Sequence, residues 1–165
     1  MTASEPLSLE EEYAMQATWA VDETKCTFIV LDSDTRINRV GRSAAFGGMI
    51  GDVNLYSTSR TTSEIEIMIA EESARGQRHG LTALLLMMHY ATTQLGTTEF
   101  FAKVSDKNEA SLALFRRTLG FVVAERSEFF KETTLVASLE IVKKALERLG
   151  EVTVEEFDDE EKVQP

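Results

Sequence analysis

"EIEIMIAEESARGQRHGLTALLLMMHYATTQLG" occupies residues 64–96 and joins two hydrophobic patterns of different period. Residues 64–70 alternate Glu64, Glu66 and Met68 with three isoleucines, which predicts a half-buried strand. Residues 79–95 repeat leucine and methionine every three or four positions, which predicts a helix that Gly96 ends. The junction between strand and helix contains Arg75, Gly76, Gln77, Arg78, His79 and Gly80.

This junction has the composition of an anion-binding turn. A helix leaves its first amide groups unpaired, and those amides together with the helix dipole attract anions. Arg75 and Arg78 add positive charge. A solvated turn is the alternative that these residues alone leave open. A Walker P-loop is excluded because no Gly-Lys-Ser/Thr follows, and a dinucleotide fingerprint because its first glycines are missing.

The flanking segments predict an α+β fold built on one mixed sheet with helices on both faces. The capping-box pattern at Ser8 predicts a helix over residues 9–20, and residues 33–48 have the composition of a loop. Asn108 is a natural N-cap for a second helix over 108–120. Strands are expected at 26–32, 49–58 and 99–105, a hairpin at 121–128 and 131–140, and a last helix at 141–150. The helix joining strands 64–70 and 99–105 makes them parallel, whereas the first three strands form an antiparallel meander.

The charge of the chain is concentrated at its ends. Of a net charge of −11, residues 151–165 contribute −6 and residues 1–12 contribute −4, so the body is nearly neutral. A nucleic-acid partner is therefore not expected, since no basic stripe is present. We expect one domain over residues 1–150 and an acidic, disordered tail over 151–165.

The remaining composition bears on location and partners. No apolar run approaches the roughly 20 residues of a membrane helix, so no membrane partner is expected. The single cysteine, Cys26, excludes an internal disulfide and suits a reducing compartment, with the cytosol the first choice and the nucleus the second. The residues do not indicate an oligomeric state.

Several segments together resemble the GNAT superfamily of acetyl-CoA-dependent N-acetyltransferases. Arg75 and Gly80 match the family's Gln/Arg-x-x-Gly-x-Gly/Ala pattern, in which Arg78 replaces the middle glycine. "SEPLSLEEEYAMQ", "KCTFIVLD", "GDVNLY" and "EIEIMIAEESARG" are similar to the N-acetyltransferase 9-like branch, and the resemblance covers about residues 3 to 135. Members of that branch have a strand and a helix ahead of the "TASEPL" region. The fold is thus expected to be N-terminally shortened, with the strand at 26–32 at an exposed sheet edge.

The resemblance implies a binding mode for acetyl-CoA. Its pantetheine arm would lie where strands 64–70 and 99–105 splay apart and pair with the backbone near Met68, Ile69 and Ala70. Its pyrophosphate would contact the amides of residues 76–80, which include Gly76, Gln77 and His79. Asn108 and Ser111 would face the thiol, although Asn108 also serves as a plain helix cap. No metal is implied.

The resemblance also guides the choice of catalytic residues. Many family members use a tyrosine in the later helix as the general acid, and the matching residue here is Phe115, which has no proton to donate and is expected in the core. Glu66 and Glu64 are the candidate bases, because both lie on the strand beside the expected thioester. A catalytically silent binding protein of the same fold is the competing interpretation.

The acceptor is an amine, and acidity narrows its class. An α-amino group has a pKa near roughly 8 and a lysine side chain near roughly 10.4, so the α-amine has far more free base at neutral pH. A site without an evident general acid suits the α-amine, which is the more readily deprotonated nucleophile. A protein N-terminus is therefore the expected acceptor, with a small-molecule amine second.

Overall fold

The computed structural model describes residues 8–32 and 48–154. Six strands form one mixed sheet in the order β1-β2-β3-β4-β6-β5, in which only β3 and β4 are parallel neighbours. The strands are β1 (Lys25–Leu31), β2 (Met49–Ser57), β3 (Thr62–Ile69), β4 (Glu99–Ser105), β5 (Val122–Ser127) and β6 (Glu132–Ser138). They confirm the predicted strands within two residues at each end, and the antiparallel meander is confirmed as well.

The place of β6 between β4 and β5 was not predicted. Thr133, Leu135 and Ala137 of β6 are buried, whereas β5 is almost entirely exposed. The inner strand of the hairpin is therefore the one that brings a buried face to β4.

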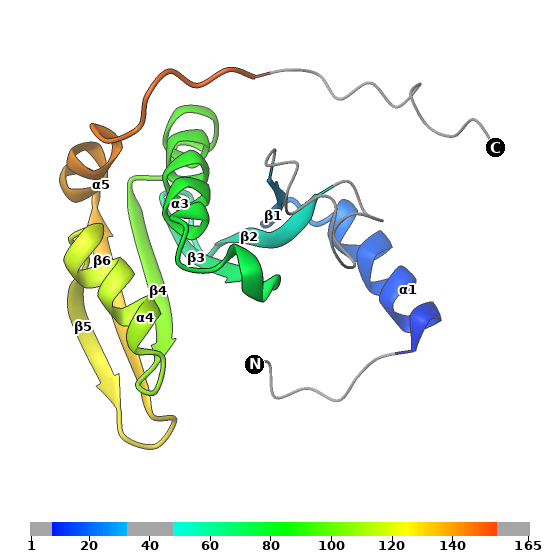
Figure 1. Cartoon of the computed structure of the whole chain (residues 1–165), viewed down its shortest axis with the longest axis horizontal. Helices are drawn as coiled ribbons and strands as arrows, with labels where there is room; N and C mark the ends of the chain where they lie inside the picture. The colour runs from blue at the N-terminus through cyan, green and yellow to red at the C-terminus, as the bar shows by residue number, and fades with distance from the viewer. Residues whose placement is uncertain (1–7, 33–47, 155–165) are drawn as a thin grey trace.

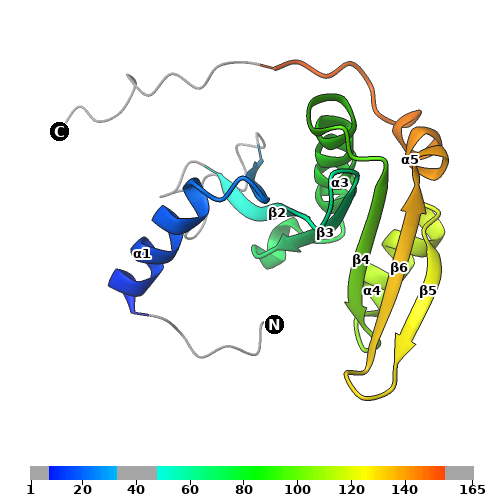
Figure 2. The ribbon, with the colours of Figure 1, turned by 180° about the vertical axis from the view of Figure 1, so that it is seen from behind.

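The described residues form the helices α1 (Leu9–Ala20), α3 (His79–Tyr90), α4 (Glu109–Ala113) and α5 (Leu139–Leu146). The last turns of the two predicted middle helices are π-helical, over Ala91–Leu95 and Leu114–Thr118. Figures 1 and 2 show α3, α4 and α5 together on one face of the sheet. Residues 33–47 of the predicted loop and 155–165 of the predicted tail lie outside the described residues.

The core lies between that face and the three helices. Alternate residues of the central strands point into it, including Leu55, Ile65, Phe100 and Leu135, each with at most 1 % of its surface exposed. From α3 the core receives Ala83, Leu84, Leu85, Met87 and Met88. Burial of this leucine and methionine face accounts for the helical period read from the sequence.

The second face of the sheet is much more open. Its residues, among them Tyr56, Glu64, Glu66 and Lys103, are half-buried or exposed. In the described part of the chain, the end of α1 is the helical segment that approaches this face. There the Lys25 ammonium group lies 5.4 Å from the centre of the Trp19 ring.

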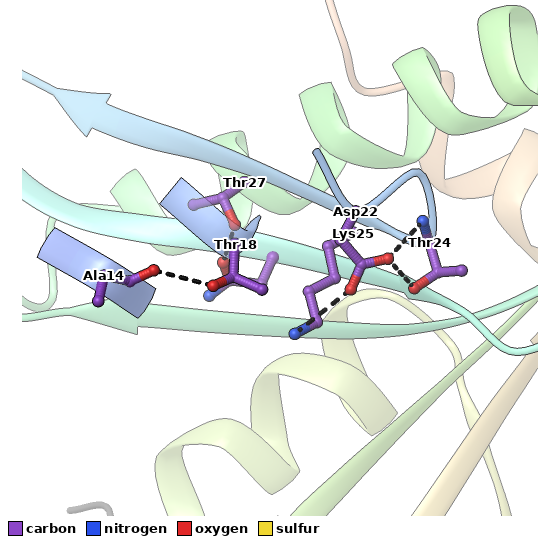
Figure 3. Close-up of polar contacts among 7 residues, drawn as sticks. Ala14, Thr18, Asp22, Thr24, Lys25 and Thr27 are labelled. Atoms are coloured by element: carbon purple, nitrogen blue, oxygen red, sulfur yellow. Dashed lines mark hydrogen bonds and ion pairs between the residues drawn. The ribbon is translucent and has the colours of Figure 1, made fainter. Parts of the chain in front are cut away.

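Local hydrogen bonds fix both ends of α1. The predicted capping box is present, since the Ser8 hydroxyl accepts from the Glu11 amide and the Glu11 carboxylate accepts from the Ser8 amide. After the helix, the Asp22 carboxylate accepts from the Thr24 amide and hydroxyl and lies 3.6 Å from Lys25, as Figure 3 shows. These contacts turn the chain from α1 into β1.

Strand β1 is an edge of the sheet, as predicted. Among the described residues it pairs only with β2, and Phe28, Ile29 and Leu31 are 42 %, 53 % and 55 % exposed. The neighbouring strand requires glycine at one position. A Cβ at Gly51 would overlap the Met68 carbonyl oxygen of β3, so no other residue allows these backbones to approach so closely.

We predict that Gly51→Ala destabilises the fold by about 1–3 kcal/mol, because the new methyl group forces β2 and β3 apart. Gly80→Ala is the matched control, since a Cβ there meets only side-chain atoms at 3.7 Å or more. Urea denaturation of both variants measures the effect. Equal midpoints for Gly51→Ala and the parent chain would contradict the predicted overlap.

Candidate functional site

The central feature of the site is an opening between β3 and β4. The two strands pair only through Thr62–Glu99, Ser63–Phe100 and Glu64–Phe101. Beyond those pairs β3 continues to Ile69 and β4 to Ser105 without pairing to each other. The predicted splay is confirmed, and it leaves facing backbone edges that a third extended chain can enter.

Two interactions hold the far end of β3. The amides of Ala70 and Glu71 both donate to the Ile50 carbonyl, a two-against-one arrangement that bends the strand end as a β-bulge does. The Arg75 guanidinium donates to the carbonyls of Ile69 and Ala70 at 2.9 and 3.1 Å. The Ala70 amide, expected to pair with pantetheine, is thus already bonded within the protein. Arg75 was expected to contact the phosphate, and here its Nε and Nη2 atoms donate to carbonyls at the end of β3.

The turn after β3 has alternating backbone handedness. Glu72–Ala74 forms a short 3-10 turn, and the Gln77 side chain donates to the Ser73 carbonyl at 2.7 Å. Gly76 and Arg78 have φ of 74° and 71°, with Gln77 between them on the ordinary negative side. Such an alternation turns successive amides toward one concave side, where they bind anions.

The helix dipole adds to this arrangement. Helix α3 begins at His79, and Arg78 provides no side-chain cap. Among the described residues, no protein acceptor takes the amides of residues 76–80. The structure therefore brings together at one turn the predicted residues Gly76, Gln77, Arg78, His79 and Gly80, and the geometry of this turn fits a phosphate.

Arg78 adopts the conformation that glycine prefers. Its φ of 71° and ψ of 1° lie in the left-handed region, where a Cβ costs about 1–2 kcal/mol. Its side chain is exposed, so its charge is available to a ligand at the turn. Arg78, in place of the glycine of the family pattern, therefore strains the local backbone and adds a positive charge to the turn.

We predict that Arg78→Gly stabilises the folded chain by about 0.5–1 kcal/mol. The relief of left-handed strain exceeds the extra conformational entropy that glycine gives the unfolded chain. Thermal or urea denaturation measures the change, and Lys131→Gly is a second test because Lys131 also has positive φ, at 54°. A loss of stability in Arg78→Gly would contradict the strain.

The second face supplies acidic groups beside the opening. Glu64 is paired with Lys103, its carboxylate 3.2 Å from the ammonium nitrogen. Glu66 lies opposite Asn54 on β2, but the Asn54 amide donates to Asp52 at 2.6 Å instead. Partial burial, and then the negative charges of Glu64 and Asp52, raise the pKa of Glu66 above its ordinary value. Of the two predicted bases, Glu64 is therefore the one that pairs with a cation among the described residues, and Glu66 is the one that does not.

Tyr56 belongs to the same group of side chains, although it was not among the predicted site residues. Burial, followed by the charges of Glu66, Asp52 and Glu64, raises the pKa of its hydroxyl. Tyr56 therefore stays neutral at pH 7 and can donate a hydrogen bond on this face. Its place opposite Glu64 follows from strand register, which the sequence pattern alone does not give.

The start of α4 confirms the capping role of Asn108, whose side chain accepts from the Ser111 amide at 3.1 Å. Phe115 is 2 % exposed and packs edge-to-face on Phe121, with ring centres 5.1 Å apart, which confirms it as a core residue. No general acid stands at that position. The predicted contacts of Asn108 and Ser111 with a thiol stay predictions.

The described residues contain no group of three or more histidine, cysteine or acidic side chains arranged for a metal ion. None of the described helices combines the length and apolarity needed to cross a bilayer.

Comparison with known proteins defines the class of this fold and site. The sequence profile of the acetyltransferase (GNAT) domain matches residues 1–122, and the chain belongs to this family. Within it, the chain is 47 % identical to human alpha/beta-tubulin-N-acetyltransferase 9 over 138 residues, which is 82 % of this chain and 66 % of that protein. It is 49 % identical to an N-acetyltransferase 9-like protein of Nematostella vectensis over 137 residues, 81 % of this chain and 68 % of that protein.

A solved structure supports the fold. The chain superposes on the spermidine N-acetyltransferase of Vibrio cholerae, crystallised with CoA and spermine, with a TM-score of 0.68. The match covers 85 % of this chain and 81 % of that one, at 18 % identity. The fold is therefore that of a GNAT acetyltransferase, and at such identity the superposition carries no information about the substrate.

Proposed function

We propose that this chain is an acetyl-CoA-dependent N-acetyltransferase of the cytosol whose acceptor is a protein N-terminal α-amino group. The observation that carries the proposal is the opening between β3 and β4, which leads to a turn at the start of α3 whose amides have no acceptor among the described residues. An extended arm with a phosphate group at its end fits this combination. Family membership and the names of the relatives support the same activity.

The site residues divide the binding of acetyl-CoA between them. The unpaired edge of β3 near Met68 and Ile69 would hold the pantetheine arm as an added strand. The amides of residues 76–80 would receive the pyrophosphate, and the exposed Arg78 side chain would add charge to it. Bound acetyl-CoA supplies an activated acetyl thioester.

We predict that acetyl-CoA raises the stability of the chain by about 2.7 kcal/mol at 100 times its dissociation constant, because only the folded state presents the turn and the opening. Thermal denaturation with and without acetyl-CoA measures the shift, and free acetate is the control ligand. An unchanged melting temperature at millimolar acetyl-CoA would contradict the proposal.

Glu66 is the proposed general base. Attack of a free amine on the thioester carbon forms the C–N bond and breaks the C–S bond, and the amine must lose a proton. In the proposed reaction this proton passes to Glu66, directly or through one water, and the departing thiolate takes a proton from solvent. The raised pKa of Glu66 lies nearer to the pKa of the acceptor amine than that of an ordinary carboxyl group, which favours the proton transfer.

We predict that Glu66→Gln lowers turnover at least about tenfold. In the parent chain kcat/KM should fall as pH drops below the raised pKa of Glu66, since the base must be ionised. Glu64→Gln removes a negative charge that raises this pKa, so the acidic limb should move to lower pH. Lys103→Met removes a charge that lowers it, so the limb should move to higher pH. If the acidic limbs of the Glu64→Gln and Lys103→Met variants shift in the same direction, Glu66 is not the general base.

The names of the human and Drosophila relatives point to α- and β-tubulin as acceptors, which places a protein among the first acceptors to test. The α-amine is favoured over lysine because its free base is more abundant at neutral pH. Two peptides separate the classes: one with a free N-terminus and no lysine, and one with a blocked N-terminus and a single lysine. Mass spectrometry should find acetylation of the first only.

A catalytically silent acetyl-CoA-binding protein is the second candidate, and buried Phe115 favours it because that position offers no proton. The two candidates differ in one measurement. Both bind acetyl-CoA, but only the enzyme transfers the acetyl group to a peptide or to a small amine.

A further inference from the structure

A buried ionisable contact joins β1 to the start of α3. Asp32 directly follows β1 and is 8 % exposed, and its amide donates to the Gly48 carbonyl at 2.9 Å. One carboxylate oxygen of Asp32 lies 3.5 Å from Nε2 of His79, and both atoms are shielded from solvent. The short distance between these two shielded, ionisable side chains links the end of β1 to the start of α3.

His79 occupies a decisive place in the turn. It is the first residue of α3, and its backbone amide is one of those for which the described part of the chain offers no acceptor. It directly follows Arg78, whose left-handed backbone is strained. Strained backbone persists only where its surroundings hold it on both sides.

The two sides of Arg78 are held differently. Before it, Arg75 bonds the carbonyls of Ile69 and Ala70, and Gln77 bonds the Ser73 carbonyl. After it, the first side-chain contact is that of His79 with Asp32. Loss of this contact would free the first turn of α3 to relax away from the conformation that gathers the amides.

We propose that Asp32 and His79 are a positioning pair, which fixes the amides of residues 76–80 and thereby sets the affinity for the pyrophosphate of acetyl-CoA. This inference rests on the proposed function. Neither side chain contacts the reacting atoms. The pair acts by preorganisation, because a turn that is already ordered loses less conformational freedom when the ligand binds.

The test is a double-mutant cycle on the full chain: Asp32→Ala, His79→Ala and the combination, titrated calorimetrically with acetyl-CoA. Ser63→Ala is the matched control, since it breaks a buried side-chain bond to Thr97 at the other end of β3. Each single variant should raise Kd about tenfold, and the double variant no further. Ser63→Ala should stay within about twofold of the parent Kd.

Steady-state kinetics provide a second readout. KM for acetyl-CoA should rise in His79→Ala, while kcat at saturating acetyl-CoA and KM for the acceptor stay unchanged. An unchanged Kd for acetyl-CoA in His79→Ala overturns the inference. It is also overturned if the increase in Kd of the double variant equals the product of the increases in the two single variants. If Asp32→Ala does not fold, His79→Ala against Ser63→Ala still decides. Failure of the parent chain to bind acetyl-CoA would instead refute the proposed function.

Discussion

After Glu64 and Phe101, β3 and β4 stop pairing, and the rest of the site depends on this interruption. A parallel pair normally satisfies its backbone groups along its whole length. Here β3 and β4 leave backbone groups beyond Glu64 and Phe101 that do not pair across the opening, and only at the end of β3 does Arg75 bond two of the carbonyls. The acidic face beside Glu66 and the turn before α3 both become useful because they border this opening.

The anion-binding turn shows how one role is divided among several residues. Gly76 and Arg78 supply the backbone handedness, while Arg75 and Gln77 bond carbonyls and keep the turn in place. The positive charge of Arg75 was read from the sequence as a phosphate ligand, but its hydrogen bonds show a structural use. Arg78 is exposed at the same turn and carries its charge on a strained backbone.

The sequence predicted most of the fold, because periodicity reports burial directly. The alternation in residues 64–70, the leucine repeat after residue 79 and the capping box at Ser8 each depend on neighbours close in the chain. The splay of β3 from β4 and the sheet edge at β1 came from the family resemblance, and the structure confirms both. The order of β6 and β5 was not predicted, because a hairpin pattern does not say which strand meets β4.

Pairwise contacts in the site were the part that the sequence could not give. Glu64 and Lys103 are 39 positions apart in the sequence, so their pairing depends on the register between β3 and β4. The contact of Asp32 with His79 depends on where β1 ends relative to α3. Gly51 was the exception that could have been found, since an isolated glycine within an alternating strand signals a close backbone approach. Its partner, the Met68 carbonyl, still required the structure.

The short seam between β3 and β4 also has a mechanical meaning. The sheet consists of two three-stranded plates, β1-β2-β3 and β4-β6-β5, joined along their hydrogen bonds at only three residue pairs. Figure 1 shows α3 beside this seam. The buried side chains of α3 belong to the same hydrophobic core as those of both plates. Each plate is internally well paired, so the seam is the part of the sheet with the fewest residue pairs between neighbouring strands. A molecule that hydrogen-bonds to both edges would extend the backbone pairing between the two plates beyond these three residue pairs.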